Sequence, residues 1–340
     1  MALALVLIVA ACVGTSAPSA HSSTSPSAPS TPSPSPKSST APKVVGFSCR
    51  LPVSSITTDG PAGGFIAFPA GTFEADPAAR RTPAYFDRAV SAWLPVGRQA
   101  VSPDGSHYAT TTQGVGDGTQ TPATLHIVAA STGAERVIPM TALRPQPATS
   151  GPFLEVLDFE SDAVYGMERG QAGVGELYRV DLSTGAVTDL RGAVRPEAVE
   201  SGGFWFGGPD PNATGLGAPP IDLERWDLRS RTTSIWFHRP SADVWFLGLD
   251  RRGAAVVLVY NHNSGGNALS TEIWLVTQPG NESRIYFAPT SDQTLALPIG
   301  MIADEHGLWF GSAKGVLFYS PDIGVRKVSD YAGYPANGCA

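Results

Sequence analysis

The sequence is poor in charged residues and contains no run of lysine or arginine. Only 16% of its 340 residues are Asp, Glu, Lys or Arg, and the formal net charge is −7. Nucleic acids and anionic membrane surfaces are bound through clustered positive charge. We therefore expect no nucleic-acid partner and no polybasic membrane-binding surface.

Several sequence signatures of enzymes are also missing. The chain has no Gly-x-Ser-x-Gly nucleophile elbow, no His-Glu-x-x-His zinc motif and no phosphate-binding loop. Glycine-rich stretches occur at residues 114–118 and 170–175, but no helical pattern follows either of them. We expect hairpin loops there, and no residue is predicted to be catalytic.

The apolar stretch at residues 2–11 is too short to span about 30 Å of hydrocarbon, which takes roughly 20 residues. Its length and its small final residues are typical of a signal peptide. The sequence Val9-Ala10-Ala11-Cys12 resembles the lipobox of bacterial lipoproteins, in which the cysteine receives lipid and begins the mature chain. Residues 1–11 lack the positive charge with which signal peptides begin, so an upstream start and an ordinary apolar segment stay open as alternatives.

The stretch after Cys12 has the composition of a disordered stalk. Residues 15–43 are almost entirely Ser, Thr, Pro and Ala, with Lys37 and Lys43 as the only full charges. So little apolar surface cannot offset the entropy of ordering, and the prolines favour extended polyproline II. The resemblance implies a protein tethered by lipid on Cys12 to the extracytoplasmic face of a bacterial cell membrane. We divide the chain into a signal peptide (1–11), a stalk (12–43) and a folded domain (44–340).

The chain has three cysteines, an odd number that needs explaining in an exported protein. Lipid on Cys12 leaves Cys49 and Cys339 as a pair at the two edges of the folded region. We predict a disulfide between them that fastens the two ends of the fold, with two unrelated buried thiols as the alternative.

A repeat with a period near 50 residues indicates the fold. Glycine and proline are abundant (37 and 30 residues), which suits short strands joined by tight turns. Five β-type segments begin 44 to 52 residues apart, and each is followed by a polar turn and a second β-type run. The segments begin at Leu125, Leu177, Leu223, Ile273 and Leu317. With one more strand upstream of each pair and an outer strand, every repeat forms a four-stranded antiparallel blade.

Two motifs carry a resemblance to known propellers. Residues 304–316 resemble the blade motif of periplasmic sensor propellers and of the virginiamycin B lyase group. Ser102-Pro-Asp-Gly105 resembles the turn of TolB-type propellers. We therefore predict an all-β protein, a β-propeller of six blades with five and seven left open, in which residues 65–96 form an irregular blade.

Five residues are candidates for ligand binding. Trp205 lies beside a long loop at residues 207–220 that includes Asp210. The site suits an aromatic platform for a sugar or glycan, with a tolerated surface insertion as the alternative for the loop. His262 occupies a polar hairpin tip, whereas Asp304 and His306 precede a strand and face either the channel or a turn. Core packing for Trp205, a solvated loop for the histidines and a turn cap for Asp304 are the structural alternatives.

The sequence leaves the function open between classes. We expect an envelope lipoprotein whose propeller binds a small ligand, a glycan or a protein partner without catalysis and without a cofactor. The alternative is a lactonase- or lyase-like enzyme that uses a divalent metal ion at the central channel. A scaffold in envelope assembly, as in TolB-like propellers, is a third hypothesis.

Overall fold

The computed structural model describes residues 46–115, 120–140, 153–169, 175–194, 196–209, 219–263, 268–289 and 298–339. The chain divides into two units, Met1–Pro42 and Lys43–Ala340, and all the described residues belong to the second. Their regular structure consists of β-strands and one 3-10 helix, η1 (Arg98–Ala100). Among these residues there is no apolar helix of membrane-spanning length.

Three consecutive stretches of chain each fold into a separate four-stranded antiparallel sheet, the blade that the repeat predicts. A fourth stretch has the same four-strand arrangement, but its strand β22 (Leu308–Ser312) also pairs with the C-terminal strand β25 (Gly333–Pro335), so that it belongs to a larger, eight-stranded sheet. Blade 3 contains β9 (Phe153–Phe159), β10 (Ala163–Arg169), β11 (Gly175–Asp181) and β12 (Val187–Val194). Blade 4 contains β13 (Pro196–Glu200), β14 (Gly203–Pro209), β15 (Pro220–Asp227) and β16 (Thr233–His238). Blade 5 contains β17 (Ala242–Leu249), β18 (Ala255–His262), β19 (Ala268–Gln278) and β20 (Asn281–Pro289). Blade 6 contains β21 (Pro298–Ala303), β22 (Leu308–Ser312), β23 (Gly315–Ser320) and β24 (Gly324–Ser329).

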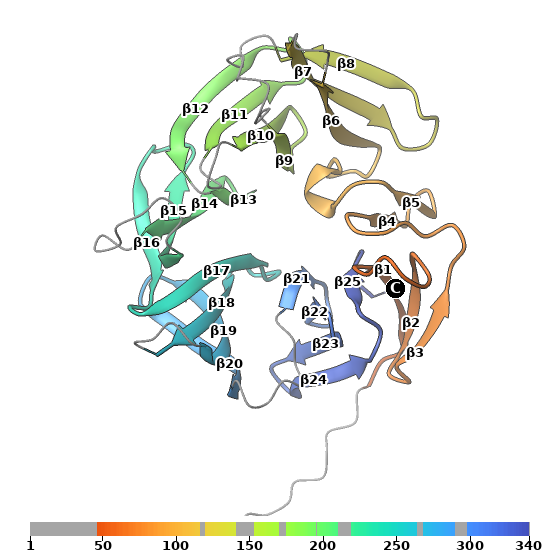
Figure 1. Ribbon diagram of the computed structural model, residues 1–340, viewed down its shortest axis with the longest axis vertical. Coiled ribbons are helices and arrows are strands. Elements are labelled where there is room, and N and C mark those ends of the chain that lie inside the picture. The colour runs from red at the N-terminus through yellow and green to blue at the C-terminus, as the bar shows by residue number, and fades with distance from the viewer. Residues whose placement is uncertain are drawn as a thin grey trace, which may run out of the picture. The chain divides into compact units, whose positions relative to one another are not determined.

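The remaining strands complete the folded unit. Blade 1 joins the C-terminal strand β25 (Gly333–Pro335) to β1 (Cys49–Ser55), β2 (Gly63–Phe68) and β3 (Thr72–Ala75). Blade 2 contains β6 (His107–Val115), β7 (Gln120–Ala129) and β8 (Glu135–Pro139), with Val101 bridging to Tyr108 on its inner side. Strands β4 (Tyr85–Asp87) and β5 (Ala92–Leu94) form a separate hairpin between blades 1 and 2 (Figure 1).

The hydrophobic core lies between successive blades rather than inside any one of them. Strand alternation sends neighbouring side chains to opposite faces, and each face packs on a different blade. Phe204 and Phe206 of β14 pack toward blade 3, whereas Trp205 between them packs toward blade 5. Further clusters join blades 2 and 3, 5 and 6, and 6 and 1, so the blades follow one another around a ring (Figure 1).

The two edges of the folded unit meet in blade 1. Strand β25 pairs antiparallel with β1, from Val53 opposite Pro335 to Ser55 opposite Gly333. The pair expected from the sequence, Cys49 and Cys339, is joined by a disulfide with 5.6 Å between the Cα atoms. The ring is therefore closed by the backbone pairing of β25 with β1 and by a disulfide between two cysteines that are 290 positions apart in the sequence.

The structure confirms the all-β propeller and corrects one detail of it. Residues 65–96 do not form a blade of their own. Strands β2 and β3 belong to blade 1, because β1 and the C-terminal β25 supply its inner strands, and β4 and β5 form the separate hairpin.

Candidate functional site

A cavity of about 530 Å³ lies among the inner strands of the ring. We call it the central channel. Strands β9, β13, β17 and β21 each contribute side chains to it, together with η1 and the segment after β25. Its charged and amide-bearing lining residues are Arg98, Gln99, Glu155, Asp158, Glu160, Glu200 and Asn337.

Glu200 is held across the boundary between two blades. It ends β13 in blade 4, and its Oε2 accepts a hydrogen bond of 3.2 Å from the backbone N–H of Leu249 in blade 5. Gly248, next to Leu249, leaves space for the Glu200 carboxyl. A Cβ at this position would lie 2.9 Å from Met301 Cε and 3.9 Å from Glu200 Oε1, and the φ angle of +143° is one that other residues rarely adopt. Glycine thus leaves room for both side chains at the channel wall.

Burial raises the pKa of Glu200 to about 7, because a carboxylate loses solvation in this position. The nearby charge of Asp158 raises the pKa further. The Leu249 N–H and the Arg98 guanidinium oppose these effects. Near neutral pH the Glu200 carboxyl therefore exists in both its neutral and its ionised form.

Asp158 of β9 is the second channel carboxyl with a raised pKa. Burial raises its pKa to about 6, and the charge of Glu160 adds to the shift. The backbone N–H of Phe159, 2.9 Å from Oδ1, and the charge of Arg98 act in the opposite direction. Carboxyls with shifted pKa values inside a cavity are a physical marker of functional sites.

Arg98 supplies positive charge to the channel from η1. Its Nη1 donates to the backbone oxygen of Val101 at 2.8 Å, and its guanidinium lies 5.5 Å from the ring centroid of Tyr85. Asn337 donates from Nδ2 to the Tyr85 hydroxyl at 3.0 Å and to the Phe86 backbone oxygen at 2.9 Å. Arg98 and Asn337 are thus both held against Tyr85 and Phe86 of the β4–β5 hairpin.

The channel continues into an opening of about 340 Å³ at one end of the inner strands. We call this opening the mouth. It shares Asp158, Glu200, Leu249 and Ala303 with the channel and adds Ser201, Asp250 and Arg251. Asp158 and Glu200, the two carboxyls with raised pKa values, therefore line both the channel and its mouth.

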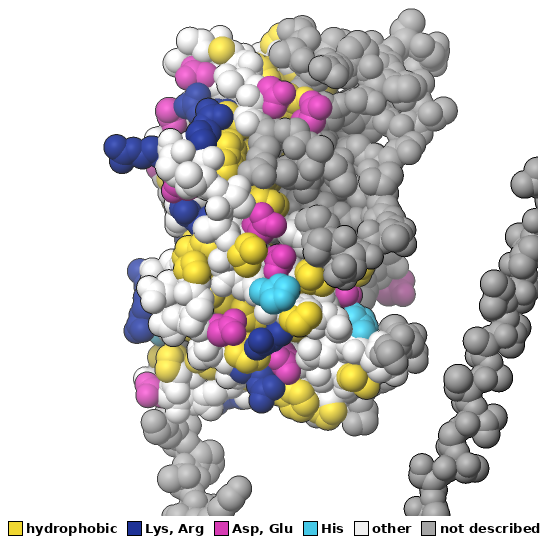
Figure 2. Space-filling model, turned by 90° about the vertical axis from the view of Figure 1, so that its left-hand side faces the viewer, with side chains coloured by type: hydrophobic (Ala, Val, Ile, Leu, Met, Phe, Trp, Pro, Cys, Tyr) yellow, Lys and Arg dark blue, Asp and Glu magenta, His cyan; other side chains and the backbone are white. Residues whose placement is uncertain are grey.

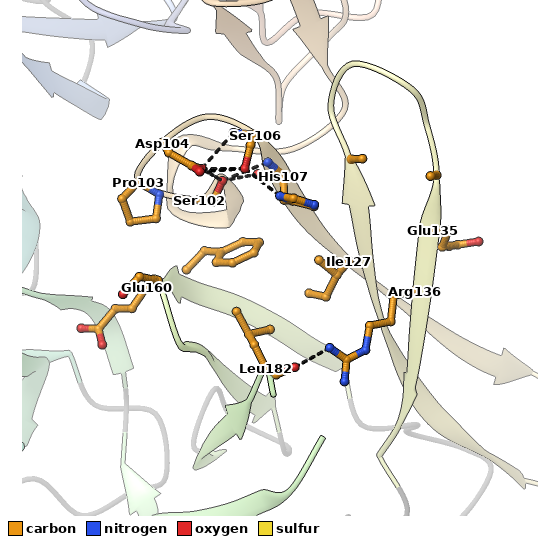
Figure 3. Close-up of a pocket in the computed structure, with 14 residues that line it drawn as sticks. Ser102, Pro103, Asp104, Ser106, His107, Ile127, Glu135, Arg136, Glu160 and Leu182 are labelled. Atoms are coloured by element: carbon orange, nitrogen blue, oxygen red, sulfur yellow. Dashed lines mark hydrogen bonds between the residues drawn. The ribbon is translucent and has the colours of Figure 1, made fainter. Parts of the chain in front are cut away.

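A second cavity, of about 620 Å³, lies between blades 2 and 3 (Figure 3). On one side, the Ser102 hydroxyl (2.7 Å) and the backbone N–H and hydroxyl of Ser106 donate to Asp104 Oδ1. These bonds lower the pKa of Asp104 to about 2. On the other side, Arg136 donates to the backbone oxygen of Leu182 and so ties the two blades together.

The serine, histidine and aspartate of this cavity do not have the order of a catalytic triad. The Ser106 hydroxyl contacts both Asp104 and the His107 Nδ1, at 2.7 Å, so the serine lies between the acid and the base. A triad needs the histidine in that middle place. A cavity of about 410 Å³ between blades 5 and 6 is lined by the corresponding turns at Asp250 and Asp304. Pockets of this kind recur between blades because the turns that line them recur with the repeat. The central channel does not repeat in this way, so we take it as the candidate site.

The outer side of the ring carries a mixed surface over the described residues of blades 4 and 5 (Figure 2). Figure 2 shows basic, acidic and hydrophobic side chains interspersed over the described part of this face. Ile235 of β16 and Phe287 of β20 are about half exposed, at 55% and 50%. Single exposed apolar side chains are ordinary on a protein surface.

Trp205 belongs to the core between blades 4 and 5. It is 1% exposed and stacks on Phe246 at 5.0 Å, with the edge of Trp236 at 4.8 Å. A side chain so buried offers no face to a sugar, so the structure favours the packing alternative over the aromatic platform. Asp210 lies outside the described residues.

His262 ends β18, away from the channel. Its Nε2 lies 2.9 Å from Asp243 Oδ2 in the same blade, outside hydrogen-bonding alignment. His306 lies in the turn before β22, where its ring stacks on Phe47 with 3.8 Å between centroids. Neither residue is among those that line the channel.

Asp304 joins three parts of the fold and does not face the channel. Its Oδ2 accepts the indole N–H of Trp309 at 2.6 Å and the backbone N–H of Cys339 at 2.7 Å. Its Oδ1 accepts the backbone N–H groups of His306 and Gly307. Asp304 therefore caps a turn and also fixes the C-terminal segment.

The channel residues Glu200, Asp158 and Arg98 were not among the candidates from the sequence. One sequence pattern could have indicated Asp158 and Glu200. Each is an acidic residue inside or at the end of a short apolar run that precedes a repeat, as in Leu157-Asp158-Phe159 and Val199-Glu200. At Asp158 and Glu200 this acidic residue lines the central channel.

No family model and no curated protein matches the chain. Among solved structures, an oligogalacturonate lyase from Vibrio parahaemolyticus is 11% identical with a TM-score of 0.45, covering 68% of this chain and 64% of the lyase. The β-propeller domain of the Trilobed protease from Pyrococcus furiosus is 13% identical (TM-score 0.42; 72% and 70% covered). TolB from Acinetobacter baumannii is 15% identical (TM-score 0.39; 84% and 66% covered). The chain spans less than two thirds of the lyase, and these similarities concern the fold alone.

Proposed function

We propose that this protein is an exported, lipid-anchored β-propeller that binds a ligand in its central channel without transforming it. The observation that carries the proposal is the channel itself, a cavity of about 530 Å³ with charged and amide side chains from several blades. Cavities of this size are typical of small-molecule sites, in which a few polar groups set orientation and specificity.

The channel wall is suited to binding because its polar groups are held in place before a ligand arrives. The Leu249 N–H fixes Glu200, and two hydrogen bonds from Nδ2 fix Asn337. Groups fixed in this way lose little conformational entropy when a ligand binds. A ligand on the axis would contact the inner strands of four blades.

Membrane anchoring through Cys12 is the second part of the proposal. Lipid on this cysteine and a Ser/Thr/Pro stalk over residues 12–43 would hold the propeller clear of the membrane surface. Metabolic labelling with a fatty acid tests it. Label should appear on the mature protein that begins at Cys12 and disappear in Cys12→Ser, and label that survives the substitution would exclude this anchor.

Hydrogen exchange on the full chain carrying Cys12→Ser tests the site of binding. The panel contains hexylamine, glucose, galacturonate, glutamate and Mg²⁺, each added separately. A compound that raises the melting temperature should slow exchange in β9, β13, β17 and β21. Protection restricted to the junction between blades 2 and 3, or to the outer strands, would place binding elsewhere and contradict the proposal.

The alternative function is a metal-dependent lactonase- or lyase-like enzyme acting in the same channel. Carboxyls titrating near pH 6 and 7, as Asp158 and Glu200 do, are suited to proton transfer. In the described ranges, no three His, Cys, Asp or Glu side chains form a group that suits a metal ion. Turnover of a lactone or a uronide with added Ca²⁺, Mg²⁺ or Mn²⁺, lost in Glu200→Gln, would favour this alternative.

A further inference from the structure

Resting on the proposed binding function, we propose that the channel ligand carries an organic cationic group, an ammonium or a guanidinium, which Glu200 and Asp158 bind together. The two carboxyls come from adjacent blades, 3 and 4, and line the same channel and the same mouth. A group entering through the mouth therefore passes both of them.

The balance of charge in the channel favours a cation. Its lining contains the carboxyls of Glu155, Asp158, Glu160 and Glu200, and Arg98 is the basic side chain among the described lining residues. At the mouth, Asp250 adds a carboxylate, whereas Arg251 Nη1 lies 3.7 Å from the Glu305 carboxylate. A positive ligand would relieve the excess of negative charge, whereas an anion would increase it.

The rest of the lining favours an organic cation over a bare metal ion. Leu247, Met301 and Ile302 are partly exposed and line the channel together with the carboxyls. These apolar side chains offer contact to the carbon atoms of an amine, and they offer no oxygen ligand to a hard metal ion such as Mg²⁺. The wall thus combines acceptors for an ammonium group with apolar surface for its chain.

Proton release should accompany binding of the cation. The groups that act electrostatically on Glu200 are Asp158, Arg98 and the Leu249 N–H, and those acting on Asp158 are Glu160, Arg98 and the Phe159 N–H. A cation between the two carboxyls favours their ionised forms, so the proton on Glu200 leaves to solvent. Affinity should therefore rise with pH between about 5.5 and 8.

Isothermal titration calorimetry with hexylamine tests the inference on the full chain carrying Cys12→Ser. Hexanol is the neutral probe of similar shape, and Mg²⁺ is the metal probe. Hexylammonium should bind roughly tenfold more tightly at pH 8 than at pH 5.5 and should release protons to the buffer. Glu200→Gln and Asp158→Asn should each weaken binding by roughly tenfold or more.

The matched control is Glu135→Gln, which removes a carboxylate from the cavity between blades 2 and 3 and should leave binding unchanged. Equal binding of hexanol, tighter binding of Mg²⁺, or hexylammonium binding that survives both channel substitutions would overturn the inference. If glucose or galacturonate protects the inner strands and hexylammonium does not, the cation inference fails and the channel site stands. If no compound of the panel protects the inner strands, the proposed function fails as well.

Discussion

Replacing Glu200 with glutamine should stabilise the protein at alkaline pH and leave its stability almost unchanged at acid pH. The folded protein raises the pKa of this carboxyl from 4.5 to about 7. Folding therefore favours the protonated form, and the native state binds more protons than the unfolded chain between these two values. Stability falls as pH rises through this window, and the full penalty is present above it.

The size of the penalty follows from the pKa shift. One pKa unit corresponds to 1.36 kcal/mol, so the ionised Glu200 destabilises the native state by about 3 kcal/mol at pH 8. Glutamine is neutral at every pH and retains an oxygen that accepts the Leu249 N–H. The variant should therefore gain about 3 kcal/mol at pH 8, which is about 5 °C in melting temperature for a chain of this size, and almost nothing at pH 4.

Thermal and urea unfolding of both proteins at pH 4, 6 and 8 measures the difference. Glu74→Gln on β3 is the matched control, because the Glu74 side chain is 75% exposed. A difference in stability between Glu200→Gln and the native protein that stays constant from pH 4 to pH 8 would contradict a raised pKa at Glu200. A loss of stability at pH 8 would do so as well, since it would mean that the carboxylate is stabilising in its site.

Three further variants test the elements that build the ring and its channel. Replacing Cys49 and Cys339 with serine should lower the free energy of unfolding in urea by up to about 5 kcal/mol, and mass mapping that finds free thiols in the native protein would contradict this. Gly248→Ala should cost about 1–3 kcal/mol, since alanine is strained at φ +143° and its Cβ meets Met301; unchanged stability would show that the backbone relaxes. Asp304→Ala should cost about 3 kcal/mol in urea unfolding, because it deprives the buried Trp309 indole and the Cys339 N–H of their acceptor, and a loss below about 1 kcal/mol would argue against that role.

The parts of the fold that follow from local sequence were the most predictable. The segments beginning at Leu125, Leu177, Leu223, Ile273 and Leu317 all lie in the strand next to the outermost strand of their blades. Their turns contain Gly or polar residues whose conformation is set by neighbours in sequence, such as Gly133 with φ at +70°. Local patterns of this kind can be recognised without knowing what packs on the blade.

The channel could not be predicted in the same way, because its properties arise between blades. The pKa of Glu200 depends on burial against blade 5 and on Asp158 of blade 3, which lies 42 positions earlier in the sequence. Asp304 similarly accepts an N–H from Cys339, 35 positions away. Nothing in the neighbouring sequence of either residue specifies these partners.

Trp205 illustrates the same limit for aromatic residues. Alternation predicts that Trp205 and its neighbour Phe206 point to opposite faces of β14, and the structure has them so. In an open sheet one of those faces would meet solvent. In a propeller both faces meet another blade, so Trp205 is core although it precedes a long loop.

A crystal structure of the full chain carrying Cys12→Ser, grown with hexylamine at pH 8, would show whether the channel binds a cation. We expect one hexylammonium in the channel, with its nitrogen about 3 Å from oxygens of Glu200 and Asp158 and its chain along Leu247 and Met301. Density for the amine at a blade junction, or an empty channel at a concentration that saturates binding in solution, would contradict it.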